Sequence, residues 1–235
     1  MQKKSMSKHS PEEVQRLVSQ VPFFNDLRET DKEQFERIMQ ETEVQIFEPG
    51  EIILRKASQD KIFYSLIKGK VDVFPDYEPS EKAISQLSSG QILGALGIIN
   101  DEVRTATLAA SNDEGATLIA TDFSMMGELN DFSHLSMGTK ISFYNNVVNN
   151  IRWKLEVYKK NTSDPTLAQE LQLLTPYEGK KGLYSELEHL AEHAEMLGSL
   201  LDCWNDAAEP EIELPPRMTS NGDKKGMFAS LFKRK

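Results

Sequence analysis

The chain has 235 residues, 39% of them hydrophobic, and a formal net charge of −10. Mean hydropathy is −0.48, and no apolar run approaches the roughly 18–20 residues that cross a bilayer, which argues against a membrane-spanning chain. The negative charge repels nucleic acid, and a single cysteine, Cys203, cannot form an internal disulfide. We therefore expect a cytoplasmic protein without a signal peptide, built from one domain of typical size and an appendage.

Two helix-start signals lie near the N-terminus. Ser10 is followed by Pro11 and then by Glu13, a capping box that predicts a helix through about Gln20. Residues 30–33 form a second box and predict another helix. We expect a narrow buried stripe behind that second start. Its members are Phe35, Ile38 and Met39.

From Val44 to about Thr121 the pattern changes to short apolar runs, many of them β-branched, with no long helical period. Many short strands at such spacing predict a sandwich or barrel, such as a jelly roll. Helical periodicity returns near Phe123 and continues, with interruptions, to about Asn205. The predicted fold class is therefore α+β. The residues that separate the short runs are Gly50, Gly69, Pro75, Pro79, Gly90 and Gly115.

The strongest candidate for a functional residue is Arg104, in the segment 94–107. A glycine turn, a short apolar run and a polar loop precede this arginine. Backbone N–H groups in a tight turn can point at one phosphate oxygen, and a guanidinium can grip the others in a bidentate fork. The segment therefore indicates an anion-binding site.

The segment resembles the phosphate-binding cassette of the cyclic-nucleotide-binding domain family. That cassette reads roughly Phe-Gly-Glu-Leu-Ala-Leu, then a short loop, then Arg-(Ser/Thr/Ala)-Ala. In this chain residues 93–94 match Phe-Gly, residues 96–99 match the apolar helical turn and residues 104–106 match the arginine segment. The resemblance extends over roughly residues 20–160.

Three further stretches resemble the barrel of that family. Residues 47–53 look like an early strand with its Pro-Gly-Glu turn, and residues 63–74 look like a second hairpin whose glycine, Gly69, reverses the chain. Residues 87–93 lead into the cassette as expected. Together these stretches imply a cyclic-nucleotide-binding-like β-jelly-roll barrel that is flanked by helices and followed by a long helix and a helical C-terminal module.

The resemblance implies a site for a cyclic nucleotide, which would be cAMP, cGMP or a cyclic dinucleotide. The family's ribose-binding glutamate falls on Ala95, and losing a hydrogen bond of about 1.5–3 kcal/mol weakens binding very roughly 10- to 150-fold. Three interpretations stay open: a weakened or altered nucleotide site, a site for another anion, or a degenerate fold kept for protein contacts. In an empty pocket, Glu102 is available to pair with Arg104. The implied ligand-binding residues are Gly94, Ala95, Leu96, Arg104, Thr105 and Ala106.

The first long helical pattern after the barrel has apolar residues at alternating spacings of four and three, beginning at Met137. Its β-branched members favour a two-stranded coiled coil, and members of the resembled family often dimerise through a helix at this place. We therefore expect a homodimer; the alternative is that the stripe covers the barrel of its own subunit. The predicted interface residues are Ile141, Tyr144, Val148, Ile151, Leu155 and Tyr158.

A second heptad run lies within residues 183–207, after a segment rich in helix breakers. Transcription factors of the family often hold a helix-turn-helix here, but this run carries six acidic side chains and no lysine or arginine, so DNA binding is not expected. Residues 189–193 match the H-x-x-E-H zinc pattern. Catalytic zinc needs a third protein ligand, normally far downstream, but only 42 residues follow His193, and we interpret the segment as a polar flank of the seam. We find no nucleophile–base pair or Walker sequence, so neither an enzyme nor a metal site is expected.

The C-terminus reads as an extended linker followed by a basic tail with one apolar helical face. Such a tail suits docking into a partner protein, and weak adhesion to anionic lipid or a plain solubilising role is the alternative. The apolar face consists of Met227, Phe228, Leu231 and Phe232. The predicted organisation is an N-terminal arm (1–20), a barrel domain (21–135), a dimerisation helix (136–160), a helical module (161–208), a linker (209–223) and a tail (224–235).

These features together predict a non-enzymatic regulatory protein that signals by protein–protein contacts through its C-terminal helices and tail. The alternative is a ligand-free adaptor with a degenerate barrel. A transcription regulator or a membrane-associated protein fits the sequence less well.

Overall fold

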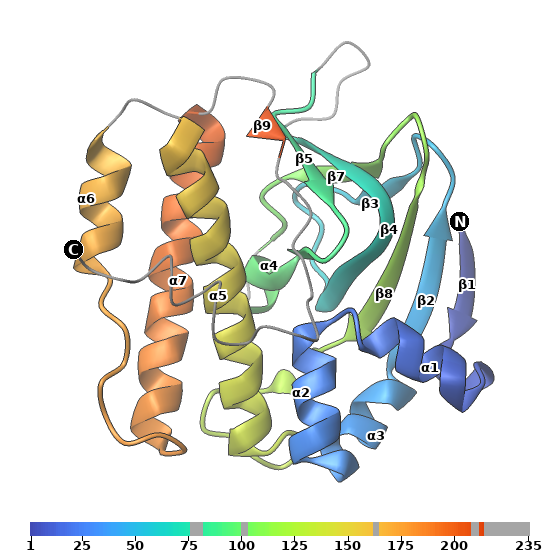
Figure 1. Cartoon of the computed structure of the whole chain (residues 1–235), viewed down its shortest axis with the longest axis horizontal. Helices are drawn as coiled ribbons and strands as arrows, with labels where there is room; N and C mark the ends of the chain where they lie inside the picture. The colour runs from blue at the N-terminus through green and yellow to red at the C-terminus, as the bar shows by residue number, and fades with distance from the viewer. Residues whose placement is uncertain (76–81, 100–102, 162–164, 208–211, 214–235) are drawn as a thin grey trace.

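The computed structural model describes residues 1–75, 82–99, 103–161, 165–207 and 212–213. A curled sheet forms one side of the molecule, the C-terminal helices lie along the opposite side, and the N-terminal helices lie at one end (Figure 1). In chain order the elements are β1 (Gln2–Ser5), α1 (Pro11–Val18), α2 (Pro22–Thr30), α3 (Lys32–Gln40), β2 (Thr42–Phe47), β3 (Ile52–Leu54), β4 (Ile62–Phe74), β5 (Ser85–Ser88), β6 (Ile92–Leu93), α4 (Ala95–Ile99), β7 (Thr107–Ala110), β8 (Ala116–Asp122), α5 (Met137–Asn161), α6 (Pro165–Leu173), α7 (Tyr184–Ala207) and β9 (Ile212–Glu213). The predicted α+β class is confirmed.

Helices α1 and α3 begin at side chains that cap them. The Ser10 hydroxyl accepts a hydrogen bond from the Glu13 N–H at 3.3 Å, and the Glu13 carboxylate accepts one from the Ser10 N–H, so the first capping box is confirmed. The second helix start differs from the prediction by one residue. Asp31 caps α3 by accepting from the Gln34 N–H, whereas Thr30 is the last residue of α2. The predicted buried stripe on α3 is confirmed.

Strand β4 joins the two halves of the sheet. Its first half pairs with β8, and its second half pairs with β5 and β7. The predicted reversal of the chain at Gly69 is therefore wrong, because Gly69 lies inside a continuous strand. This residue has φ +86°, and a Cβ there would lie 2.1 Å from the carbonyl oxygen of Gly115. Glycine is required at position 69 by the close approach of a neighbouring turn.

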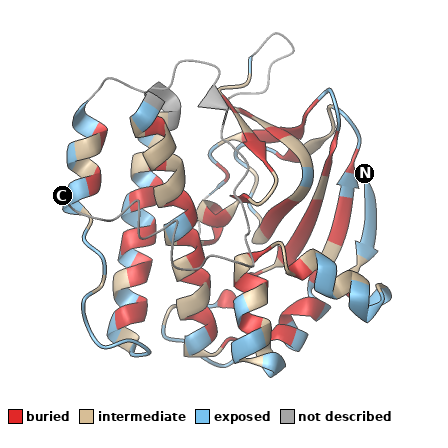
Figure 2. Ribbon diagram, viewed as in Figure 1, coloured by how far each residue is buried: buried red, intermediate tan, exposed pale blue. Residues whose placement is uncertain are grey.

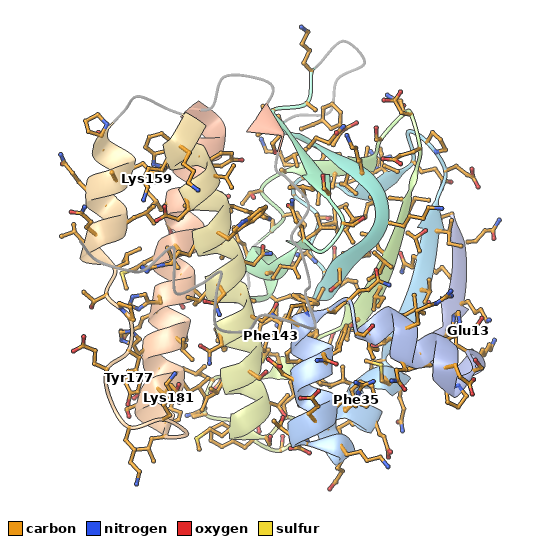
Figure 3. All side chains as sticks on the ribbon, in the orientation of Figure 1. Glu13, Phe35, Phe143, Lys159, Tyr177 and Lys181 are labelled. Atoms are coloured by element: carbon orange, nitrogen blue, oxygen red, sulfur yellow. The ribbon has the colours of Figure 1, made fainter. Side chains whose placement is uncertain are left out.

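Four phenylalanines pack α5 against α2 and β4. One of them, Phe143, is labelled in Figure 3. Phe23 of α2, Phe63 of β4, Phe123 and Phe143 of α5 are all fully buried. Their ring centroids lie between 4.8 Å (Phe123 to Phe143) and 6.5 Å (Phe23 to Phe63) apart. Burying one such side chain contributes roughly 1.5–3 kcal/mol. Helix α5 is therefore part of the barrel's core rather than an independent rod.

Helix α5 also packs along α7, and the two helices turn buried faces toward each other (Figure 2). Four of the predicted dimer-interface residues, Tyr144, Ile151, Leu155 and Tyr158, are buried within the single chain. The other two, Ile141 and Val148, are half-buried and pack against the same core. In this arrangement the stripe covers its own subunit and is not free to form a seam with a second copy. Homodimerisation itself stays a prediction. No helix among the described residues has the length and hydropathy of a membrane span.

Candidate functional site

Arg104 is held at the rim of the barrel by its main chain. Its N–H donates to the carbonyl of Ser58 at 2.9 Å, and its carbonyl accepts from the N–H of Ala57 at 2.8 Å. These two bonds tie the arginine to the turn between β3 and β4. The residue is only 4% exposed, so its side chain runs inward beneath α4.

The guanidinium of Arg104 is engaged almost entirely by groups of the chain itself. Nε donates to Asp60 Oδ2 at 3.4 Å, and Nη2 donates both to Asp60 Oδ1 and, at 2.8 Å, to the Ile62 carbonyl. Nη1 donates to the Gly94 carbonyl. These four bonds use four of the five N–H groups of an arginine. The bidentate fork that we expected to hold a phosphate therefore holds the Asp60 carboxylate, while Glu102 lies outside the described residues.

The two glycines of the cassette make room for this arginine. A Cβ on Gly94 would lie 2.7 Å from Arg104 Nη1, and one on Gly97 would lie 2.9 Å from the same atom. Real Cβ atoms do not come so close to a nitrogen, so larger residues at either position would push the guanidinium away. The space that these two glycines leave is therefore occupied by the arginine itself.

The environment of Asp60 favours its ionised form. Burial alone would raise the pKa of this carboxyl, but hydrogen bonds from Arg104 and from the Ile62 N–H, together with the guanidinium charge, hold the pKa below its ordinary value. Asp60 is thus a carboxylate at neutral pH and a firm partner for Arg104.

A cavity of about 120 Å³ lies beside Arg104, inside the open end of the barrel. All six predicted ligand-binding residues line it, so the structure brings Gly94, Ala95, Leu96, Arg104, Thr105 and Ala106 together as expected. Ala95, at the first position of α4, contributes a methyl group to the wall where the resembled family has a carboxylate. Pockets for drug-sized ligands usually measure about 300–1,000 Å³, so a nucleotide requires some side chains to move.

The C-terminal helices close this cavity. Helix α5 contributes Asn150 and Lys154 to its wall, and α7 contributes Leu201 and Asp202. The Thr105 hydroxyl, which we expected to serve the ligand, lies 3.3 Å from Asp202 Oδ1 and donates to it. Helix α7 also packs directly on α4. Position 198 of α7 is a glycine, and a Cβ there would lie 2.5 Å from a Leu96 methyl group.

Sequence reasoning missed the two acids that bond to the cassette, Asp60 and Asp202. Asp60 follows a short polar stretch that matches no motif, and Asp202 lies almost a hundred residues after Arg104. Only the tertiary structure brings them to the cassette. No pattern in the sequence could have assigned either residue to the site.

The predicted docking tail and the predicted linker have different outcomes. The apolar face of the tail, from Met227 to Phe232, lies outside the described residues. Of the predicted linker, Ile212–Glu213 forms β9 and pairs in parallel with β5.

In the H-x-x-E-H segment the rings of His189 and His193 stack with centroids 4.1 Å apart. Among the described residues, no group of three or more potential metal ligands gathers there or elsewhere.

Comparison with known proteins agrees with this architecture. Residues 44–122 match the family profile described as the cyclic nucleotide-binding domain. These residues form a domain of that family. The domain comprises the strands from β2 to β8 and the cassette with Arg104.

The curated relatives are much longer proteins. The chain is 28% identical over 110 residues to cGMP-dependent protein kinase 2 of Mus musculus. This match covers 46% of this chain and 14% of the kinase. It is 25% identical over 103 residues to the cAMP-dependent protein kinase regulatory subunit of Mycosarcoma maydis, covering 44% and 18% of the two chains. The chain thus spans less than a fifth of the length of these relatives.

Solved structures of similar fold include a putative cyclic nucleotide-binding protein from Geobacter metallireducens GS-15. That protein is 22% identical, with a TM-score of 0.47, and the match covers 61% of this chain and 96% of that one. A second is the regulatory domain of Toxoplasma gondii PKA with cAMP, at 18% identity and a TM-score of 0.37, covering 47% and 44% of the two chains.

Proposed function

We propose that this chain is a non-enzymatic, cytoplasmic regulatory protein. In this proposal its barrel keeps a modified cyclic-nucleotide-type pocket, and its C-terminal helices carry the signal to a partner protein. The observation that carries the proposal is the position of Arg104, which lies in the wall of a cavity that α7 closes. A ligand in that cavity contacts the cassette, α5 and α7 at once.

The residues present fit a cyclic nucleotide only in part. Arg104 keeps one N–H on Nη1 beyond its four internal hydrogen bonds, so it can donate to a phosphate oxygen without releasing Asp60. Ala95 offers no acceptor for a ribose hydroxyl. We therefore expect binding to be weak, and either a cyclic mononucleotide or a cyclic dinucleotide is a candidate ligand.

Ligand binding and the position of α7 are coupled in this arrangement. Leu201 and Asp202 line the same cavity as Arg104, so a guest larger than the cavity displaces them. A ligand shifts a conformational equilibrium only by its difference in affinity for the two states. The ligand binds the state with α7 displaced more tightly than the state with α7 docked, which supplies this difference in affinity. The acidic outer face of α7 is then the surface that binds the partner protein.

A ligand-free adaptor is the second candidate. Two observations favour it: the fork of Arg104 is occupied by Asp60, and the cavity of about 120 Å³ is small. In this case the barrel serves as a rigid base for α5 and α7, and the partner binds whether or not a nucleotide is present. The basic tail stays a prediction as a docking segment for such a partner.

A thermal-shift screen with cAMP, cGMP and cyclic dinucleotides separates the two candidates. A ligand present at 100 times its dissociation constant stabilises the fold by about 2.7 kcal/mol. We expect a shift in the wild type at high ligand concentration and none in Arg104→Lys, which keeps the charge but loses the fork. Lysine is preferred to alanine because alanine leaves Asp60 and the carbonyls of Ile62 and Gly94 without the donor that Arg104 supplies.

Arg55→Lys is the matched control, because Arg55 is exposed on the neighbouring turn. It should respond to the ligands as the wild type does. If no cyclic nucleotide shifts the wild type, the adaptor is the better account. An equal shift in Arg104→Lys would show that binding occurs elsewhere.

A further inference from the structure

A second cavity, of about 250 Å³, lies among the C-terminal helices. Its walls come from α5, from the segment 176–181 and from α7, and no residue of the barrel lines it. Tyr177 and Lys181 mark its position near the end of α7 that is remote from β9 (Figure 3). This cavity is therefore separate from the pocket beside Arg104.

Three buried nitrogen atoms in the walls of this cavity lack a hydrogen-bond partner. They are Arg152 Nε, His189 Nε2 and His193 Nε2, none of which has a partner within hydrogen-bond distance among the described residues. The Thr175 backbone also interacts with the His193 ring and favours its protonated form. Buried polar groups are nearly always satisfied, so each exception calls for a ligand, an ion or a water molecule. That three such atoms line one cavity points to a common guest.

The two histidines are held rigidly beside each other. His193 is 7% exposed, and its Nδ1 lies 3.2 Å from the His189 carbonyl, one turn earlier on α7. The His189 ring stacks on His193 and also contacts the ring of Tyr177, with centroids 5.3 Å apart. The Tyr177 hydroxyl is occupied by Ser185 and the Lys180 carbonyl. Because Nδ1 of His193 is directed at the His189 carbonyl, Nε2 is the ring nitrogen that a guest can contact, in competition with the Thr175 backbone.

The charges around the cavity are mainly positive. Arg152 is anchored by a hydrogen bond from Nη2 to the Leu174 carbonyl. The charge of Glu156, one turn further along α5, also acts on Arg152, but this carboxylate forms its salt bridge with Lys159. Lys181 lies at the exposed edge. The one acid in the wall is Glu186, which is 3% exposed and accepts from the Gly182 N–H at 2.6 Å, with the Lys181 ammonium 3.7 Å away. The negative charge of Glu186 is thus partly offset by its own partners.

A metal ion does not fit this arrangement. The two imidazoles lack a third protein ligand among the described residues, and the guanidinium and the ammonium repel a cation. An anion fits the positive charges, since a buried arginine is stabilised by an acceptor that carries negative charge.

We infer that this cavity binds a small oxoanion, a carboxylate or a phosphate group, with Arg152 Nε–H and the Nε2 atoms of His189 and His193 as its donors. Proton uptake from solvent accompanies binding, because a histidine that already directs Nδ1–H at a carbonyl must be protonated to donate from Nε2. The stacked rings repel each other when both are charged, so one proton is expected. The site couples an anion to α7, the helix that also closes the barrel cavity.

The test is NMR of the four histidine side chains in the full chain, with inorganic phosphate and acetate as probes. Burial and the neighbouring His189 hold the pKa of His193 below its ordinary value in the free protein. An anion that pairs with the imidazolium raises this pKa, by about one unit if the protonated state binds tenfold more tightly. We expect the imidazole resonances of His189 and His193 to move together, and those of His9 and His134 to stay.

Variants with a matched control complete the test. Arg152→Gln should abolish the response, with the backbone spectrum showing that the fold is kept. Lys181→Gln should weaken it several-fold, whereas Lys180→Gln, on the neighbouring exposed lysine, should leave it unchanged. A response to either probe supports the site, and the stronger probe gives the class of anion.

The inference is overturned if phosphate and acetate at about 10 mM, ten times a dissociation constant of 1 mM, leave both rings unchanged. It is equally overturned if all four histidines respond alike or if Arg152→Gln responds like the wild type. The cavity then holds water only. Arg104→Lys should respond normally, so failure of this site and failure of the proposed barrel function are distinguishable.

Discussion

At the scale of single residues, the pair of Arg104 and Asp60 defines the candidate site. The sequence located the arginine through the spacing of its cassette, but it gave no sign of the acid that binds it. The reason is physical: a cassette is a local pattern of turn and helix, whereas the partner of a buried guanidinium comes from any strand that passes near. The same limit applies to Asp202, which is contributed by the last helix.

Asp60→Asn tests this pair through the pH dependence of stability. The folded-state pKa of Asp60 is depressed below the unfolded value of about 3.9. The unfolded chain therefore binds more protons in this window, and the stabilisation is fully present above that pH and lost as pH falls through the folded pKa. We expect the difference in unfolding free energy between wild type and variant, measured in urea, to shrink below about pH 4. A difference that is independent of pH would show that the carboxylate is not stabilised by Arg104.

Gly69→Ala tests the reason for the glycine inside β4. The added Cβ would lie 2.1 Å from the Gly115 carbonyl oxygen at φ +86°, so the loss should exceed the roughly 1–3 kcal/mol of backbone strain alone. Gly182→Ala is the control, because it has φ +76° but no atom within 4 Å of the new Cβ; it should cost only about 1–2 kcal/mol. Denaturant unfolding measures both losses, and equal losses would contradict the steric account.

At the scale of elements, local signals predicted the starts of α1 and α3 to within one residue, whereas α2 was not predicted. A capping box is satisfied by neighbours in sequence, so it predicts α1 well. The heptad stripe of α5 was harder to interpret, because the same spacing serves a seam with a second copy or with α7 of the same chain. Phe143 and Val147, which fall outside the predicted interface, are fully buried. The stripe is therefore wider than a two-stranded coiled coil requires, as suits a helix that is covered by both the barrel and α7.

Leu155→Ala distinguishes these two roles of α5. Leu155 is fully buried within the chain, so its truncation should lower the unfolding free energy by about 2–5 kcal/mol without changing the oligomeric state. Leu173→Ala, at a leucine that is 80% exposed on α6, should stay within about 0.5 kcal/mol of the wild type. Light scattering after gel filtration gives the oligomeric state. A dimer that dissociates in Leu155→Ala with its fold stability intact would restore the interface assignment.

At the scale of the whole molecule, the C-terminal helices and the barrel form one body around the cassette. Helix α5 is fixed to the barrel by the phenylalanine cluster, and α7 lies over the cassette through α4 (Figure 1). The fold class and the barrel could be predicted, because short strands and turns produce short apolar runs separated by glycine and proline in the sequence. The position of α7 could not be predicted, because its leucines would pack equally well on any apolar surface.

The most direct test of the modified pocket is calorimetric titration of cAMP and cGMP into the wild type and Ala95→Glu. Position 95 lines the cavity at the start of α4, where a carboxylate can accept a hydrogen bond from a ribose hydroxyl. If the pocket is otherwise intact, the variant should bind one of these nucleotides about 10- to 150-fold more tightly than the wild type. No gain in affinity for either nucleotide, in a variant that remains folded, would contradict the account and leave the barrel as a scaffold.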